Sequence, residues 1–154
     1  MTQNKSYNSL AEIQSDISTG SVTCRQLVEY YLNNINKKSH LNAFLEVFDE
    51  EARKRAEEID QKIERSKQGR LAGMVVGIKD VLCYKDHSLQ AGSRILDGFK
   101  SLYNATAVQR LLAEDAIIIG RQNCDEFAMG SSNENSASFP LGPTTIRLTF
   151  GPCV

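Results

Sequence analysis

The 154-residue sequence has few of the residues that build metal and redox sites. It contains two histidines, His40 and His87, and its four cysteines are too far apart to form a CxxC pair. Zinc sites and redox dithiols need such clusters, so we expect neither of them and no metal ion. A disulfide framework is typical of short secreted chains, and no secretion signal accompanies these cysteines. We therefore predict four reduced thiols.

The sequence also lacks an excess of charge and any long apolar run. Its 18 basic and 19 acidic side chains give a net charge of −1, without the positive excess of a nucleic-acid-binding chain. No apolar run approaches the roughly 20 residues of a membrane span. GxGxxG, P-loop and HExxH motifs are absent as well. We therefore expect a cytoplasmic protein with no membrane contact. The hydrophobic content of 41% is sufficient for the core of one domain.

Capping signals predict where helices begin. The spacing Ser9 to Glu12 predicts a first helix that ends at Gly20, and Thr23 to Gln26 predicts a second. Asp49 is the expected cap of a third helix over residues 50–66, whose charged face we interpret as solvated. A further capping-box spacing, Thr106 to Gln109, predicts a helix before the next apolar run.

Three segments have strand patterns. Leu41 to Phe48 alternates, whereas Met74 to Ile78 and Ala116 to Gly120 are almost entirely apolar, as in strands covered on both faces. Residues 84–103 show only broken periodicity and are predicted to be loop with a short helix. The order of helices and strands predicts an α/β fold with helices around a mixed sheet.

Lys79 ends the apolar run that begins at Met74. An ammonium group at the mouth of a core loses hydration, which lowers its pKa and lets it exchange a proton near neutral pH. The alternative is a strand-end lysine that extends into solvent. Lys79 is therefore a candidate catalytic residue whose role depends on its neighbours.

The polar segment Asn123 to Ala137 follows the apolar strand at 116–120 directly. Ligands of open α/β sheets bind at such strand exits, and small residues let a backbone approach a substrate closely. An ordinary surface loop with Asx turns is the alternative interpretation.

Four segments together resemble the amidase signature family. They are Gly77 to Asp80, Asn104 to Val108, Ile119 to Asn123, and Asp125 to Ala137, in the family's order and spacing. More narrowly, the run that starts at Asp125 and ends at Ser136 is similar to the A subunits of glutamyl-tRNA(Gln) amidotransferases. The resemblance implies the N-terminal part of the amidase-signature fold, which is incomplete in this chain.

The resemblance implies amide hydrolysis by a Ser, cis-Ser, Lys triad, with glutamine as the ammonia donor. Lys79 matches the triad lysine, and Met129, Gly130 and Ser131 match residues that line the carboxamide pocket. The implied partners are the B and C subunits and, through the complex, charged tRNA. No cofactor would be bound by this chain, because in the family ATP and Mg are used by the B subunit.

The sequence departs from the family where the two serines are expected. It contains no Gly-Gly-Ser-Ser-Gly-Gly region, and the resemblance is lost after Ala137. We interpret residues 1–137 as the N-terminal portion of an amidase signature domain, and 138–154 as a divergent tail produced by a frameshift or truncation. We expect the chain alone to be inactive and to expose sheet edges that aggregate. A fragment of a general amidase and a non-catalytic subunit-interaction module are the alternatives.

Overall fold

The computed structural model describes residues 6–130 and 134–137, which form an α/β fold. The helices and strands are, in order, α1 (Leu10–Ser18), α2 (Cys24–Lys37), β1 (Phe44–Val47), α3 (Asp49–Glu64), β2 (Val75–Lys79), α4 (Thr106–Ala113) and β3 (Ile117–Gln122). Short 3-10 turns occur at η1 (Ser39–Leu41), η2 (Arg94–Leu96) and η3 (Glu126–Ala128). The predicted α/β class is confirmed.

The three strands form one mixed sheet in the order β1-β3-β2. Strand β2 runs parallel to β3, and β1 runs antiparallel to it. Lys79 on β2 and Phe44 on β1 both pair with Gln122, the last residue of β3. The carboxyl ends of β2 and β3 therefore lie side by side at the same end of the sheet.

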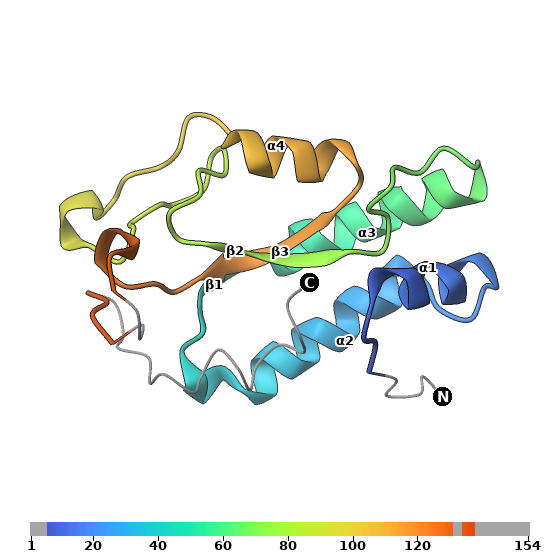
Figure 1. Cartoon of the computed structure of the whole chain (residues 1–154), viewed down its shortest axis with the longest axis horizontal. Helices are drawn as coiled ribbons and strands as arrows, with labels where there is room; N and C mark the ends of the chain where they lie inside the picture. The colour runs from blue at the N-terminus through green and yellow to red at the C-terminus, as the bar shows by residue number, and fades with distance from the viewer. Residues whose placement is uncertain (1–5, 131–133, 138–154) are drawn as a thin grey trace.

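Helices cover both faces of this sheet, with α4 on one side and α1 to α3 on the other (Figure 1). Ile117 and Ile119 of β3 are packed in the core that α2 and α3 share, whereas Ile118 packs in the core on the α4 side. Each such isoleucine contributes about 1.5–3 kcal/mol on burial. The continuous apolar run of β3 is thus explained by burial on both faces, as predicted.

The first two helices begin where the sequence predicts. The Ser9 hydroxyl accepts a hydrogen bond from the Glu12 N–H at 3.3 Å, and Gly20 follows the helix end with φ +72°. Thr23 and Gln26 form a complete capping box at the start of α2. These caps satisfy backbone donors that a helix N-terminus otherwise leaves free.

The predicted caps Asp49 and Thr106 are both wrong, because each is already the first residue of its helix. Phe48 takes the cap position of α3, since its ring is buried and its N–H donates to the Ile119 carbonyl at 2.9 Å. Ala105 caps α4, and its N–H donates to the Cys83 carbonyl at 2.8 Å. Contacts with the rest of the fold shift both starts by one residue.

The first strand is shorter than the predicted 41–48. Asn42 is left-handed, with φ 53°, and it ends η1 before the chain extends into β1 at Phe44. Residues 84–103 form turns, η2 and an isolated bridge between Ser88 and Lys100, which confirms the predicted loop with a short helix.

Candidate functional site

Lys79 is the last residue of β2, and it is exposed. The predicted loss of hydration is therefore wrong for the described chain. Ile78, the preceding residue of the same strand, is only 2% exposed, so the change from core to solvent lies between these two residues. Lys79 pairs with Gln122, the last residue of β3, so it lies beside the start of the loop that follows β3.

Asp80, the next residue, is fully buried and organises the turn beside Lys79. Its carboxylate accepts hydrogen bonds from the N–H groups of Gln90 at 3.1 Å and Gly92 at 3.0 Å. Its carbonyl accepts a third from Ala91 at 2.9 Å. Residues 90–92 are thereby fixed against the end of β2.

The same carboxylate is paired with the buried guanidinium of Arg121 on β3. Arg121 also forms an ion pair of 3.6 Å with Glu46 on β1, so its side chain links β3 to β1 and to the residue that follows β2. Sequence alone does not mark Asp80 or Arg121 as site residues. The signal that the sequence offers is an arginine near the end of an apolar strand, because a buried cation requires an acidic partner.

The turn at 90–93 and the loop after β3 are joined directly. The Phe127 N–H donates to the Ala91 carbonyl at 2.7 Å, and the Ser93 hydroxyl donates to the Glu126 carboxylate at 2.6 Å. Gly92 has φ +64°, and a Cβ at this position would lie 2.6 Å from the Cys124 carbonyl oxygen. The two backbones pass so close together that only glycine fits between them.

Three non-glycine residues of these segments have left-handed backbones. They are Ala91, Phe127 and Ala128, with φ of 51°, 50° and 58°. Such conformations cost free energy and persist where surrounding contacts impose them, and they occur often at functional sites. The hydrogen bond between Phe127 and Ala91 joins two of these residues.

The loop after β3 also folds back on itself. Asn123 is buried, and its side-chain oxygen accepts hydrogen bonds from the Cys124 N–H at 2.9 Å and the Ser136 hydroxyl at 2.7 Å. The buried Asp125 carboxylate accepts another from the Asn135 N–H at 2.9 Å. This predicted site segment is therefore built on internal polar contacts at the strand exit.

The predicted substrate residues lie in this loop. Met129 is 83% exposed, and Gly130 is packed so closely on Asp125 that an added Cβ would lie 2.3 Å from the Asp125 Cγ. Ser131 is outside the described residues, as is the predicted divergent tail at 138–154. Lys79, Met129 and Gly130 thus belong to segments at one sheet edge, and their assigned roles remain predictions.

Cys124 follows β3 at this edge but is unsuited to nucleophilic chemistry. Burial, and next the negative charge of Asp80, raise the pKa of its thiol to about 11, although the charge of Lys79 opposes the rise. A thiol, unlike a thiolate, is a poor nucleophile. Within the described ranges, no three His, Cys, Asp or Glu side chains are placed to bind a metal ion, and no helix is long and apolar enough to cross a membrane.

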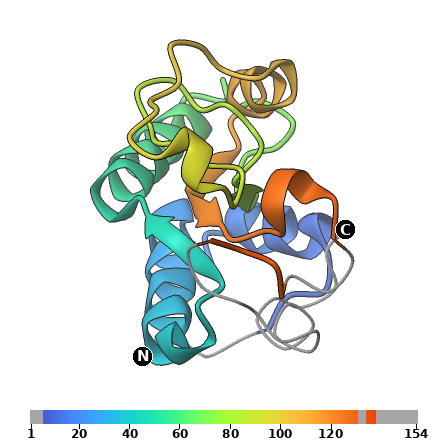
Figure 2. The same cartoon turned by 90° about the vertical axis from the view of Figure 1, so that its left-hand side faces the viewer.

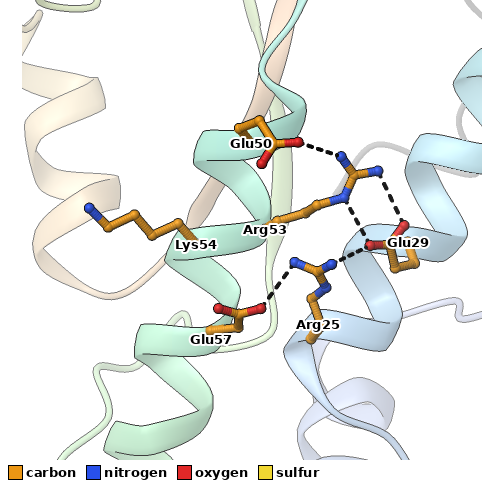
Figure 3. Close-up of a pocket in the computed structure, with 6 residues that line it drawn as sticks. All are labelled: Arg25, Glu29, Glu50, Arg53, Lys54 and Glu57. Carbon is orange, nitrogen blue, oxygen red and sulfur yellow. Dashed lines mark hydrogen bonds and ion pairs between the residues drawn. The ribbon is translucent and has the colours of Figure 1, made fainter.

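A cleft between α2 and α3 is lined by charged side chains (Figure 3): Arg25, Glu29, Glu50, Arg53, Lys54 and Glu57. Glu29 accepts from both Arg25 and Arg53, each at 2.9 Å, and Arg25 also pairs with Glu57 at 3.2 Å. These side chains neutralise one another across the two helices. The cleft is therefore an ion-paired contact between the two helices and not a second candidate site. The charged face of α3 is not solvated throughout, contrary to the prediction, because Arg53 pairs with Glu29 of α2 and Lys62 pairs with the buried Asp115.

The family model for amidases matches residues 26–145, which include both β2 and the loop after β3. The chain belongs to the amidase family. It is 48% identical over 131 residues to the A subunit of the glutamyl-tRNA(Gln) amidotransferase from Chlorobaculum parvum, and 45% identical over 136 residues to that from Chlorobium phaeobacteroides. These matches cover 84% and 88% of this chain, but only 27% and 28% of the relatives.

Solved structures give the same result for the fold. One is a chain from an inhibitor-bound vestigial complex related to the origins of an s-triazine catabolic enzyme, with a TM-score of 0.79 and 32% identity. Another is the peptide amidase of Stenotrophomonas maltophilia, with a TM-score of 0.79 and 25% identity. The matches cover 85% and 92% of this chain, and 29% and 30% of those chains. The described fold thus corresponds to part of a larger amidase fold, as predicted.

Proposed function

We propose that this chain carries the lysine-bearing part of a glutamine-hydrolysing site, as in the A subunit of a glutamyl-tRNA(Gln) amidotransferase. The observation that supports this proposal most is the position of Lys79 at the carboxyl end of β2, beside the loop that leaves β3. The choice of relative is supported by identities of 42–48% to such subunits, against 24–28% to the solved amidases.

In the proposed chemistry the Lys79 amine acts as a base. It takes a proton, through a bridging serine, from the serine that attacks the carboxamide, and later returns it toward the leaving ammonia. Met129, Gly130 and Ser131 hold the carboxamide, chiefly through backbone groups. The two serines belong to a glycine- and serine-rich region that this sequence does not contain, so the chain alone should not hydrolyse glutamine.

The proposed setting is the cytoplasm, in a complex with B and C subunits. The B subunit would use ATP and Mg to activate the glutamyl group on charged tRNA, and this chain would bind no cofactor itself. Residues 1–137 would form the amidase portion. The second candidate is a fragment of a general amidase, which the similarity to solved amidase structures supports. It is the weaker candidate because the identity to those structures is lower.

A chimaera tests the role of Lys79. The matched 131-residue segment of the Chlorobaculum parvum protein is replaced by the corresponding residues of this chain, and ammonia release from glutamine is measured. Lys79→Ala should lower the rate about 10²- to 10⁴-fold. Lys79→Arg should be as inactive, because a guanidinium stays charged. The control Lys100→Ala removes another exposed lysine and should leave the rate unchanged.

Two outcomes would contradict the proposal. A chimaera that keeps its rate after Lys79→Ala would show that the amine has no part in the reaction. Ammonia release by the isolated 154-residue chain, abolished by Lys79→Ala, would show that the nucleophile lies within this sequence.

A further inference from the structure

The loop after β3 is tied to the segment after β2 by a contact between two side chains. The Ser93 hydroxyl donates to the Glu126 carboxylate at 2.6 Å, across 33 positions of the chain, and Ser93 is only 2% exposed. A hydrogen bond to an ionised carboxylate is shorter and roughly twice as strong as one between neutral groups. This contact therefore fixes Glu126 more firmly than an ordinary surface hydrogen bond would.

Glu126 is the first residue of η3, the turn that leads into Met129. Its carbonyl accepts a hydrogen bond from the Met129 N–H at 3.1 Å, and its own N–H donates to the Asn135 carbonyl at 2.8 Å. Within the turn, Phe127 and Ala128 have left-handed backbones. Such conformations persist where surrounding contacts impose them, so the turn depends on the contacts that hold Glu126.

Ser93 itself is held against the end of β2. Its N–H donates to the Gln90 carbonyl at 2.9 Å, and this turn donates two further N–H groups to the Asp80 carboxylate, which directly follows Lys79. The turn η2 begins immediately after Ser93, and Figures 1 and 2 show η2 and η3 at the same end of the molecule. A continuous set of contacts thus joins Lys79 to the turn at 126–129, and Ser93 is its middle member.

We propose that Ser93 is a positioning residue for glutamine binding, which acts through Glu126 and does not touch the substrate. It holds the turn at 126–129 in the conformation in which Met129 and Gly130 bind the carboxamide. The proposal rests on the proposed function, which assigns the carboxamide to these residues. Without the Ser93 hydroxyl the turn relaxes, the binding-competent conformation is populated for only part of the time, and the apparent affinity for glutamine falls by that fraction.

Glutamine hydrolysis tests this role in the chimaera that carries this chain's residues in place of the matched Chlorobaculum parvum segment. Ser93→Ala should raise KM for glutamine about tenfold, since it removes a hydrogen bond to a charged group. The kcat should change by less than about twofold, because Lys79 stays on β2 and the competent conformation itself is unchanged. A folding defect alone would reduce the amount of active enzyme, and with it the apparent kcat, and would leave KM unchanged.

Ser101→Ala is the matched control. Ser101 is a second buried serine of the same segment, and its hydroxyl donates to the Tyr103 carbonyl at 2.7 Å. This substitution also removes a buried hydroxyl and its short hydrogen bond, but it leaves the contact between Ser93 and Glu126 intact. It should therefore leave KM unchanged. Thermal melting of both variants shows whether the two substitutions cost similar stability.

Substitution of Glu126 tests the same contact from its exposed side, where no buried cavity results. Glu126→Ala should raise KM as much as Ser93→Ala, and the double variant should be no worse than either single one. Glu126→Gln keeps an oxygen that accepts the Ser93 hydroxyl, so it should raise KM less than Glu126→Ala. If Ser93→Ala does not fold, the two Glu126 variants decide the question.

Three outcomes would overturn the proposal. They are an unchanged KM in Ser93→Ala, an equal rise of KM in Ser101→Ala, and additive effects in the double variant, which would mean that Ser93 does not act through Glu126. Glutamine binding to the Lys79→Ala chimaera, measured by isothermal titration calorimetry, gives the same comparison without catalysis.

The role of Lys79 is read separately, from the rate of the Lys79→Ala chimaera. If hydrolysis is lost with Lys79→Ala and KM is unchanged in Ser93→Ala, the proposed function stands and the positioning role is overturned. If hydrolysis persists with Lys79→Ala and KM rises in Ser93→Ala, the positioning role stands and the proposed role of Lys79 fails.

Discussion

The Asp80 carboxylate is buried against the Arg121 guanidinium at the edge where β2 and β3 end. Besides pairing with Arg121, the Asp80 carboxylate accepts hydrogen bonds that fix the backbone of residues 90–92. Asp80 also follows Lys79 directly in the chain. Either charge would be costly to bury alone. The geometry around Lys79 therefore depends on an ion pair that takes no direct part in the proposed chemistry.

Asp80→Ala should lower the free energy of unfolding by about 3–5 kcal/mol, because it leaves the Arg121 charge buried without its carboxylate. Urea unfolding of the purified chain measures this loss. The control Glu46→Gln removes the half-exposed partner of Arg121 and should cost at most about 1 kcal/mol. Equal losses in both variants would contradict the central position of Asp80.

Adding Arg121→Met to Asp80→Ala gives a sharper comparison. The double variant removes both charges, so it should recover part of the stability lost in the single variant. A strictly additive loss would mean that the two side chains are not coupled.

Helices and the central strand could be predicted because their signals are local. The caps at Ser9 and Thr23 use side chains within three residues, and the apolar run of β3 reports burial on both faces. The starts of α3 and α4 could not be predicted to the residue. Phe48 and Ala105 are held there by backbone bonds to Ile119 and Cys83, which are distant in the sequence.

The candidate site was predicted only in part, for the same reason. Sequence identified Lys79 and the loop after Asn123, but the pairing of Asp80 with Arg121 spans 41 positions and depends on the strand register. The exposure of Lys79, next to the buried Ile78, depends on which tertiary contacts surround the end of β2, and no local pattern reports these contacts. The expected aggregation through exposed edges remains a prediction.

Gly92→Ala should destabilise the chain by more than about 2 kcal/mol. The added methyl would require both a left-handed backbone and a contact of 2.6 Å with the Cys124 carbonyl oxygen. Gly98→Ala is the matched control, because Gly98 has φ +76° but nothing lies within 4 Å of its added Cβ. It should cost only about 1 kcal/mol. Thermal melts that show equal losses would argue against the close approach of the two loops.

Thiol titration should find one accessible cysteine among the three described ones. All three are free; Cys83 is partly exposed, whereas Cys24 and Cys124 are fully buried. Burial, with the charge of Asp60 next, raises the pKa of Cys24 to about 12. In a Cys153→Ser background, Ellman's reagent at pH 8 should detect one fast thiol, and two more after unfolding in guanidinium.

Adding Cys83→Ser to that background should remove the fast reaction and leave the slow one. Fast modification of Cys124 in the native chain would mean that the loop after β3 opens readily. Such a result would remove the basis for treating this loop as a fixed part of the site.

Asp115 should make stability depend on pH in the acid range. Burial by itself raises the pKa of its carboxyl, but a hydrogen bond from Lys62, the Gly69 N–H, and the charges of Lys62 and Arg55 outweigh burial and lower it. A lowered pKa in the folded state stabilises the chain above the unfolded pKa of about 3.9, and this contribution is lost as the pH falls through the folded value.

Asp115→Asn should therefore lower the free energy of unfolding at neutral pH by roughly 2 kcal/mol, since it removes charge-assisted hydrogen bonds. It should also make the free energy of unfolding fall less steeply below about pH 4. Urea midpoints measured from pH 7 to about 2.5 would show both effects. Glu64→Gln removes an exposed carboxyl at the end of α3 and leaves the Asp115 contacts in place, so the Asp115 contribution should persist in it. If the urea midpoint of Asp115→Asn falls with acid pH as steeply as that of the unchanged chain, protonation of Asp115 does not cause the loss of stability.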